Sequence, residues 1–253
     1  MTTNSHRIHA PWSWPNHARA AVSLTYDDGR MSHLDLAIPE LEIFQFRGTF
    51  YLTNDNPFVA ASVDRWRAAA SRGHEIGNHT FTHPTWEVLS GYDANDILAD
   101  VGYGALWLKR IIGPDPNRSF AYPGGALGIG EAHHDRDSYT TAISRYHNVA
   151  RGAGGPPNDP RDVRLPITTV NAALFDTPHE TQLDDLRDYC EVAIRNGYWA
   201  IMMFHDVVGA DYSAGDSQIG QNVHRRFLSY LKVEPYWVAP VREVANYIFQ
   251  HNE

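Results

Sequence analysis

The stretch Ser23-Leu24-Thr25-Tyr26-Asp27-Asp28-Gly29 decides how the rest of this sequence is interpreted. The apolar run 20–26 predicts a buried strand, which ends in two adjacent carboxylates and a glycine. Two like charges at the end of a buried strand repel each other and are costly to desolvate without partners. A bound cation removes that conflict. The stretch therefore indicates a metal site at the end of a core strand.

Candidate co-ligands occur about fifty residues later, in Asn78-His79-Thr80-Phe81-Thr82-His83-Pro84. The spacing of His79 and His83 predicts that both rings lie on the same side of one helical turn. Imidazole favours Zn²⁺, Co²⁺ or Ni²⁺, and two rings with one carboxylate leave coordination positions open for water and substrate. The same spacing is also typical of surface or capping histidines, and the chain has 14 histidines. The Asp-Asp-Gly sequence favours ligation.

The two aspartates are predicted to have different tasks, because consecutive side chains leave a strand in different directions. One carboxylate can bind the metal while the other takes a proton from water activated there. Gly29 allows a sharp turn behind the pair. His205 follows the most apolar strand, 199–204, and is either a satisfied core histidine or the general acid that protonates the leaving group.

Short apolar runs alternate with helical patterns, which implies parallel strands joined by right-handed crossovers. We therefore predict an α/β fold, a distorted or incomplete (β/α)7-type barrel of parallel strands, as a single domain over 1–253 with an N-terminal extension at 1–19. Strands are expected at 20–26, 48–52, 75–77, 119–122, 147–151, 199–204 and 236–238, and helices at 34–44, 63–72, 94–111, 182–196, 219–231 and 241–250. The Gly/Pro-rich stretch 152–160 is interpreted as a long βα loop.

This architecture predicts where the chemistry lies, because parallel barrels carry their active sites at the carboxyl ends of the strands. The unusual polar groups follow predicted strands: Asp27, Asp28, His79, His83, Tyr122 to Gly125, Arg151 and His205. Several independent positions therefore point to one end of the barrel.

Composition excludes some classes of partner. The formal net charge of −9 and the scattered basic residues argue against nucleic acid or an anionic membrane as the partner. The single cysteine, Cys190, excludes an intramolecular disulfide and is expected to be a buried thiol on a helix. With neither a signal-peptide pattern nor a membrane span, we expect a cytoplasmic protein, or a secreted one if a leader has been removed. The oligomeric state stays open.

Four motifs in order resemble those of the polysaccharide deacetylase family, the NodB-homology group related to carbohydrate esterase family 4. They are Thr25-Tyr26-Asp27-Asp28-Gly29, His79-Thr80-Phe81-Thr82-His83, Phe120-Ala121-Tyr122-Pro123-Gly124-Gly125 and Met203-Phe204-His205. The first two together are highly specific, whereas the other two are weak alone. The resemblance runs over almost the whole chain, from about residue 20 to 248.

The resemblance implies a role for each matching residue. Asp27 is expected to be the general base and His205 the general acid, while Asp28, His79 and His83 hold one divalent metal ion, with Zn²⁺ expected first and Co²⁺ or Ni²⁺ as alternatives. The third motif, at Tyr122 and Gly124, is expected to supply an oxyanion-hole N–H and substrate contacts.

The expected activity is removal of N-acetyl groups from amino-sugar oligo- or polysaccharide. The alternatives are an O-acetyl esterase of the xylan type and, more remotely, a non-catalytic sugar-binding protein on the same scaffold. The acetylated carbohydrate is the expected partner.

The sequence departs from the family pattern in the third and fourth motifs. Family members often carry Arg where this chain has Ala121, and Arg151 is the candidate replacement, expected to hydrogen-bond with Asp27; a purely structural Arg is the alternative. Gly124 replaces a common aromatic, which is expected to open the site. The Asp-x-x-Asp-Trp motif that tunes the general acid is not apparent, and its possible substitutes are Asp159, Asp162 and Asp176.

Overall fold

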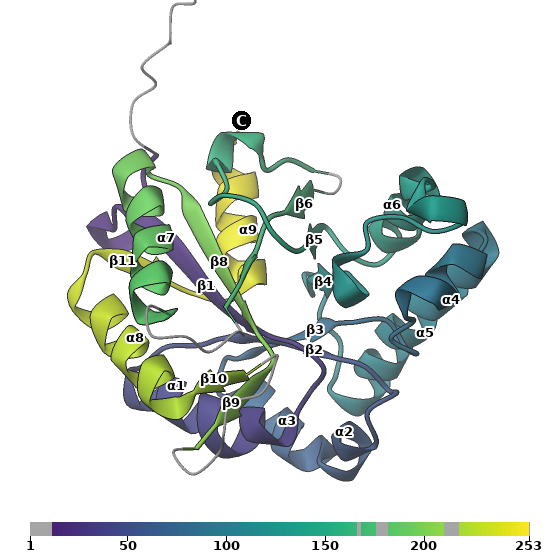
Figure 1. Cartoon of the computed structure of the whole chain (residues 1–253), viewed down its shortest axis with the longest axis horizontal. Helices are drawn as coiled ribbons and strands as arrows, with labels where there is room; N and C mark the ends of the chain where they lie inside the picture. The colour runs from purple at the N-terminus through teal and green to yellow at the C-terminus, as the bar shows by residue number, and fades with distance from the viewer. Residues whose placement is uncertain (1–11, 166–167, 176–181, 210–217, 253) are drawn as a thin grey trace, which may run out of the picture.

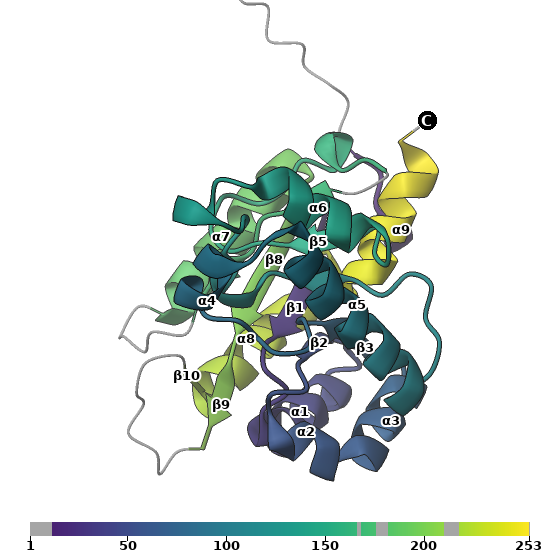
Figure 2. The same cartoon turned by 90° about the vertical axis from the view of Figure 1, so that its right-hand side faces the viewer.

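The structure is a computed structural model that describes residues 12–165, 168–175, 182–209 and 218–252. Its main sheet consists of parallel strands that curl into a barrel, with helices around the outside (Figures 1 and 2). The predicted fold class, a distorted (β/α) barrel, is confirmed.

The main sheet contains the strands β1 (Ala20–Tyr26), β2 (Thr49–Leu52), β3 (Glu75–Asn78), β4 (Phe120–Ala121), β5 (Val149–Arg151), β6 (Thr168–Val170), β7 (Ala173–Leu174), β8 (Trp199–Phe204) and β11 (Tyr236–Val238). A separate parallel pair consists of β9 (Asp206–Val208) and β10 (Gln218–Gly220). The α-helices are α1 (Ile38–Ile43), α2 (Pro57–Ala61), α3 (Val63–Ser71), α4 (Trp86–Gly91), α5 (Ala94–Ile111), α6 (Arg136–Ser144), α7 (Gln182–Asn196), α8 (Gln221–Val233) and α9 (Val241–His251).

The strand order β6-β5-β4-β3-β2-β1-β8-β7 brings the two ends of the sheet together. Only Asn171 and Ala172 separate β6 from β7, so one extended segment pairs first with β5 and then with β8. Strand β1 is also shared, because its first residues pair with β11 and its last with β2. The distortion of the barrel therefore arises from strands that change partners along their length.

Most long elements match the sequence prediction, and the differences are local. The strands 20–26, 199–204 and 236–238 and the helices 94–111 and 182–196 are confirmed at both ends. The predicted helix 219–231 begins later, because Ile219 belongs to β10. The stretch 152–160 is not a βα loop, since it leads through a 3-10 helix (Pro160–Asp162) to β6.

The alternation of side chains along β1 and β8 separates two layers of core. Val22 and Leu24 pack with Met202 in the cluster that faces the outer helices. Ala21 and Ile201 belong to the second cluster, which includes residues of α9. Because side chains alternate in a strand, Asp27 points to the same side as Ala21, into the barrel. Cys190 is buried in the outer cluster, as expected.

No helix among the described residues has the length and apolar character that a membrane span requires. The expected N-terminal extension is only partly described, since residues 1–11 lie outside the described ranges. Trp14 of that extension is buried and packs against Trp237 and Tyr247. At least this part of the extension therefore belongs to the packed structure.

Three buried histidines outside the predicted site are held neutral. Burial lowers the pKa of His33, His74 and His147 to about 4. At His147, Nδ1 donates to the Arg118 carbonyl and Nε2 accepts from the Asn78 amide, which is the pattern of a neutral imidazole.

Acidification from pH 7 to 4 should lower the free energy of unfolding. Each folded-state pKa lies below its unfolded value of about 6.5, so the unfolded chain binds more protons between about pH 6.5 and 4. Above pH 6.5 the three neutral histidines do not lower the stability of the fold. As pH falls through this window, the free energy of unfolding decreases by up to about 1.4 kcal/mol per pH unit for each histidine.

Urea unfolding at several pH values with EDTA present measures this loss. His147→Asn should be less stable at pH 7 but show a shallower decline below pH 6.5. A decline of equal slope in wild type and variant would contradict the assignment.

Candidate active site

The turn after β1 separates the two adjacent aspartates. The Asp27 N–H donates to the Phe204 carbonyl and so continues the pairing of β1 with β8. Asp28 and Gly29 then adopt positive φ angles of 74° and 64°. This left-handed turn costs an aspartate little, because Asp tolerates that region better than most residues. The Asp27 side chain stays buried in the barrel, while that of Asp28 is directed to its rim.

The segment from His79 to His83 is a loop and not the helical turn that the spacing predicted. Thr80 and His83 have positive φ angles of 63° and 49°, and no helix is present until α4. The Asp100 carboxylate on α5 accepts hydrogen bonds from the Phe81 and Thr82 N–H groups and from the Thr82 hydroxyl. Sequence reasoning missed Asp100, although an acid on the buried face of an amphipathic helix was a usable signal.

Asp28, His79 and His83 form a cluster that suits a metal ion. Their ligand atoms all lie within 4.8 Å of one another. Asp28 Oδ1 is 3.3 Å from His83 Nε2 and 3.6 Å from His79 Nε2. Ligand atoms of a tetrahedral zinc site with bonds near 2.1 Å lie about 3.4 Å apart. Asp28 Oδ1 is buried and accepts a hydrogen bond from no described residue. The cluster therefore presents an anionic oxygen whose lone pairs are available to a metal ion.

His79 presents a lone pair to this cluster. Its Nδ1 lies 2.8 Å from the Ala121 carbonyl, which can only accept, so Nδ1 must carry the proton. Burial lowers the pKa of His79 to about 4, and the ring is therefore neutral at physiological pH. Nε2 is then unprotonated and faces Asp28, which is the state that a metal ligand requires.

Asp27 is held by Arg151, as the sequence predicted. Arg151 Nη2 donates to both Asp27 carboxylate oxygens, and both side chains are buried. The Arg151 guanidinium also lies over the Tyr51 ring, 5.0 Å from its centroid. Its Nη1 contacts Met203 Sδ and donates to the Gly152 carbonyl. A planar guanidinium is therefore fixed on several sides against one carboxylate.

Both aspartates are ionised despite their burial. Burial alone would raise the pKa of Asp27, but the opposing contributions, of which the charge of the Arg151 guanidinium is the largest, outweigh it and lower that pKa. Burial also opposes ionisation of Asp28, yet the nearby histidines and the hydrogen bond from Arg30 lower its pKa to about 2. His205 follows β8, the strand that pairs with β1, and so lies at the same end of the sheet as Asp27 and Asp28.

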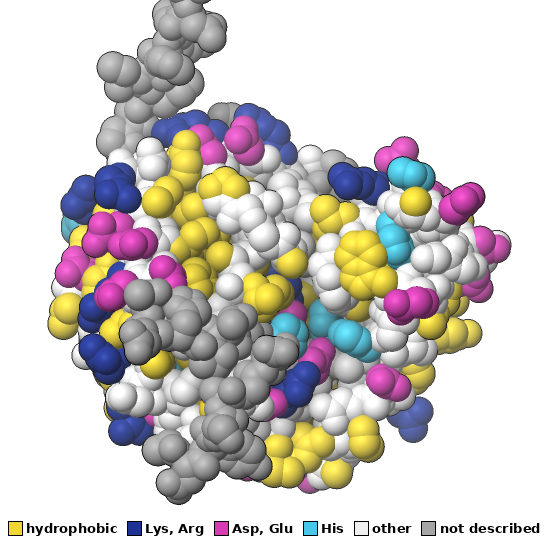
Figure 3. Space-filling model, viewed as in Figure 1, with side chains coloured by type: hydrophobic (Ala, Val, Ile, Leu, Met, Phe, Trp, Pro, Cys, Tyr) yellow, Lys and Arg dark blue, Asp and Glu magenta, His cyan; other side chains and the backbone are white. Residues whose placement is uncertain are grey.

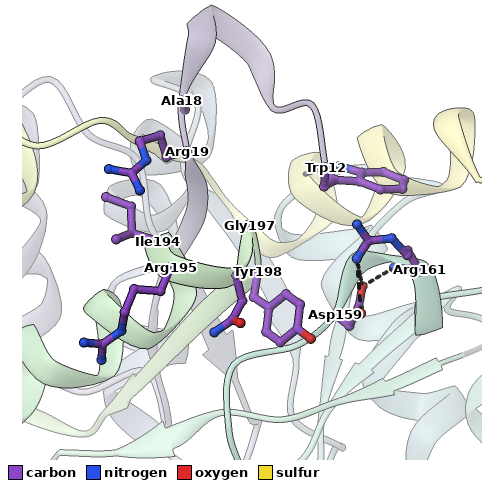
Figure 4. A pocket seen from close by; sticks show the side chains of 10 residues that line it. Trp12, Ala18, Arg19, Asp159, Arg161, Ile194, Arg195, Gly197 and Tyr198 are labelled. Atoms are coloured by element: carbon purple, nitrogen blue, oxygen red, sulfur yellow. Dashed lines mark hydrogen bonds and ion pairs between the residues drawn. The ribbon is translucent and has the colours of Figure 1, made fainter. Parts of the chain in front are cut away.

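A cavity of about 580 Å³ opens beside the cluster, lined by Asp28, Arg30, Met31, Thr53, Asp55, Asn56, Phe58, His83 and Asp206. Figure 3 shows histidine, acidic and basic side chains meeting near the centre of this face. Another cavity, of about 490 Å³, lies at the amino ends of β1 and β8 (Figure 4). It is lined by Trp12, Ala18, Arg19, Asp159, Arg161, Ile194, Arg195, Asn196, Gly197 and Tyr198. The length of β1, about 20 Å, separates it from the carboxylate–histidine cluster.

Comparison with known families agrees with this geometry. The family model described as polysaccharide deacetylase matches residues 15–142, half of the chain. The chain belongs to the polysaccharide deacetylase family. The matched region contains the Asp-Asp-Gly turn, the His79–His83 loop and the third motif. Its structural neighbours include members of carbohydrate esterase family 4.

Curated relatives are similar to this chain over limited regions. Chitin deacetylase 1 of Cryptococcus neoformans var. grubii is 28% identical over 104 residues, which cover 41% of this chain and 21% of that protein. A gellan lyase of a Bacillus species is 22% identical over 94% of this chain. That alignment covers only 10% of the lyase. The chain thus spans a small part of these relatives.

Solved structures show the same fold. A Mycobacterium smegmatis protein assigned to the polysaccharide deacetylases superposes with a TM-score of 0.68 at 16% identity, covering 95% of this chain and 93% of that one. A peptidoglycan N-acetylglucosamine deacetylase domain from Eubacterium rectale gives a TM-score of 0.59 at 15% identity, with 92% and 93% coverage. A family 4 pseudoenzyme from Bacillus anthracis gives 0.57 at 15% identity, with 89% and 65% coverage.

The third motif of this family member differs from the expectation. Tyr122 is not brought to the site: its side chain packs in the core against Tyr139 and Phe120, and its N–H donates to the Arg151 carbonyl. Gly124 lies in the first turn of a short 3-10 helix, where N–H groups lack helical partners. Of the two, Gly124 stays the candidate for an oxyanion-hole N–H.

The space beside Gly124 is not open, because Trp86 of α4 occupies it. A Cβ atom at position 124, where φ is +57°, would lie 2.9 Å from Trp86 Nε1. The same nitrogen donates to the Gly124 carbonyl at 3.3 Å, and the indole ring contacts His133 edge to face. Trp86 remains 49% exposed. The aromatic group expected from the third motif is therefore replaced by one from a neighbouring helix.

Two of the three substitutes considered for the fourth motif lie away from the end of β8 that leads to His205. Asp159 accepts from Arg161 and lines the cavity at the opposite end of the strands, and Asp162 belongs to the same 3-10 helix. Asp176 lies outside the described residues. One contact of His205 is with His33, whose Nε2–H donates to the His205 carbonyl at 2.6 Å. Burial leaves His33 neutral, so it fixes the backbone of His205 without adding charge.

Replacing each aspartate by asparagine should separate their tasks. Asp28→Asn should lose bound metal, because an amide oxygen is a weaker ligand than a carboxylate. Asp27→Asn should keep nearly all of it, since Asp27 is committed to Arg151. Metal content after dialysis against buffered Zn²⁺, measured by elemental analysis, distinguishes the two. Equal losses in both variants would show that the aspartates are not divided in this way.

Proposed function

We propose that this chain is a metal-dependent hydrolase that removes N-acetyl groups from amino-sugar oligo- or polysaccharides. The observation that carries the proposal is the pairing of an unsatisfied Asp28–His79–His83 cluster with a buried, ionised Asp27 beside it. One group of side chains suits a divalent metal, and its neighbour is a carboxylate that can accept a proton. Few other functions need both at the carboxyl end of one barrel.

In this proposal a divalent ion, when bound, would polarise the acetyl carbonyl and lower the pKa of water at the site. Asp27 accepts the proton from the attacking water, and Arg151 keeps its carboxylate in place for that transfer. In this proposal the Gly124 N–H donates to the oxyanion. His205 gives a proton to the departing nitrogen as the C–N bond breaks, so that acetate and a free amine are formed.

The exposed face of Trp86 supplies a wall for a sugar ring. An aromatic ring next to the Gly124 loop can pack against the apolar face of a pyranose while its N–H stays bonded to the Gly124 carbonyl. The ring therefore contributes binding area close to the third motif at little cost in side-chain entropy.

The N-acetyl substrate is favoured by the relatives, among which are chitin deacetylases of Cryptococcus neoformans and Colletotrichum lindemuthianum. A non-catalytic reading has a precedent in the Bacillus anthracis pseudoenzyme with the same fold. The ionised Asp27 and the His79–His83–Asp28 cluster of this chain favour activity instead.

Acetate release tests the proposal. Chitin oligomers, N-acetylated peptidoglycan fragments and acetylated xylan, each incubated with Zn²⁺- or Co²⁺-loaded protein, should show faster release from the N-acetylated sugars. In His205→Ala, turnover of the amide should fall by roughly 10²–10⁴-fold, and turnover of a sugar acetate ester should fall less. An alkoxide leaves more readily than an amine and depends less on protonation. Release from xylan alone would establish the esterase instead, and no release from any substrate would contradict the proposal.

Trp86 should affect binding more than chemistry. Trp86→Ala is expected to raise KM for chitin oligomers roughly fivefold or more, with a smaller change in kcat, because a stacking surface of about 1 kcal/mol is lost. Trp86→Phe is the matched control, since it keeps an aromatic ring face and removes the N–H and part of the ring area. Equal KM values for all three proteins would exclude a sugar contact at this position.

A further inference from the structure

Arg30 lies between the candidate metal ligand Asp28 and a second carboxylate. Its Nη2 donates to Asp28 Oδ2 at 2.9 Å and its Nη1 donates to Asp206 Oδ2 at 3.1 Å. The Arg30 side chain is 38% exposed and forms part of the cavity beside the cluster. No motif of the family accounts for this arginine. No sequence pattern singles out Arg30, because Asp206 is distant in the chain.

Arg30 gives the two carboxylate oxygens of Asp28 different surroundings. Oδ2 is bonded to the guanidinium, whereas Oδ1 faces the two imidazoles and accepts from no described residue. A carboxylate that chelates a metal must turn both oxygens toward the ion. The hydrogen bond from Arg30 opposes that rotation and leaves one oxygen for coordination.

Asp206, the second carboxylate partner of Arg30, is itself held by hydrogen bonds. Asp206 begins β9, and its Oδ1 accepts from the Ser32 hydroxyl at 2.6 Å. Ser32 Oγ in turn accepts from the Val207 N–H at 3.2 Å. The loop after β1 is thus fastened to the segment that follows His205. The ion pair with Asp206 therefore helps to hold the Arg30 guanidinium beside Asp28.

We propose that Arg30 is a positioning residue that restricts Asp28 to one metal-coordinating oxygen and weakens the binding of the metal. This inference rests on the metal centre of the proposed function. A fixed positive charge on the second oxygen reduces the negative charge available to a divalent ion. Coordination through one oxygen keeps more positions open for water and the acetyl oxygen. Arg30 therefore favours reactivity over tight metal retention.

Titration of metal-stripped protein with Co²⁺, followed by visible absorption, tests the inference without any turnover. Arg30→Met should bind Co²⁺ roughly three- to tenfold more tightly, because a repelling charge near the ion is removed. Its d–d bands should be weaker than in wild type, since chelation by both Asp28 oxygens raises the coordination number. Acetate release by the same variant should nevertheless be slower. Arg30→Lys keeps the charge and should return the affinity toward the wild-type value.

Two controls make the result decisive. Arg65→Met removes another half-exposed arginine, paired with Asp35, and should change neither affinity nor spectrum. Unchanged or weaker Co²⁺ binding in Arg30→Met, with an unchanged spectrum, would overturn the proposed role. His79→Gln tests the metal centre itself. If that variant binds Co²⁺ like the wild type, the site and the role of Arg30 both fail, whatever Arg30→Met shows.

Discussion

The buried ion pair between Asp27 and Arg151 is the contact on which the rest of the site depends. An ionised carboxylate inside a barrel is costly unless a cation and hydrogen bonds compensate it, and here one guanidinium contacts both oxygens. The pair also decides which of the two adjacent aspartates is available to join His79 and His83. Because Asp27 is committed to Arg151, Asp28 remains to complete the cluster with His79 and His83. Removing either partner would leave a buried charge alone, which typically destabilises a protein by about 3–5 kcal/mol.

Each polar group at the site is supported by a less conspicuous one. Asp100 fixes the loop that carries the two metal-ligand candidates, and the Ala121 carbonyl fixes the tautomer of His79. His33 holds the backbone of His205, and Arg30 holds the outer oxygen of Asp28. Such supporting contacts decide which lone pairs face the centre. The chemistry therefore depends on residues from several elements that are distant in sequence.

The sequence predicted the long strands and helices because their apolar periodicity is strong, and the strand-end rule then placed Asp27, His79, Arg151 and His205 together. It did not predict the short strands β6 and β7, because a segment of two or three residues has no period to detect. The loop geometry at His83 was also missed, since positive φ at a non-glycine residue is set by tertiary hydrogen bonds. The expectation that Gly124 opens the site failed for a related reason, because Trp86 from another part of the chain fills that space.

We expect one metal ion to bind to Asp28 and the two histidines while Asp27 stays with Arg151. Anomalous diffraction at the zinc edge, from crystals grown with Zn²⁺, locates the ion. We predict a single peak about 2.0–2.2 Å from one Asp28 oxygen, His79 Nε2 and His83 Nε2, with both Asp27 oxygens still on Arg151. A peak coordinated by Asp27, or none between the two imidazole rings, would contradict the account.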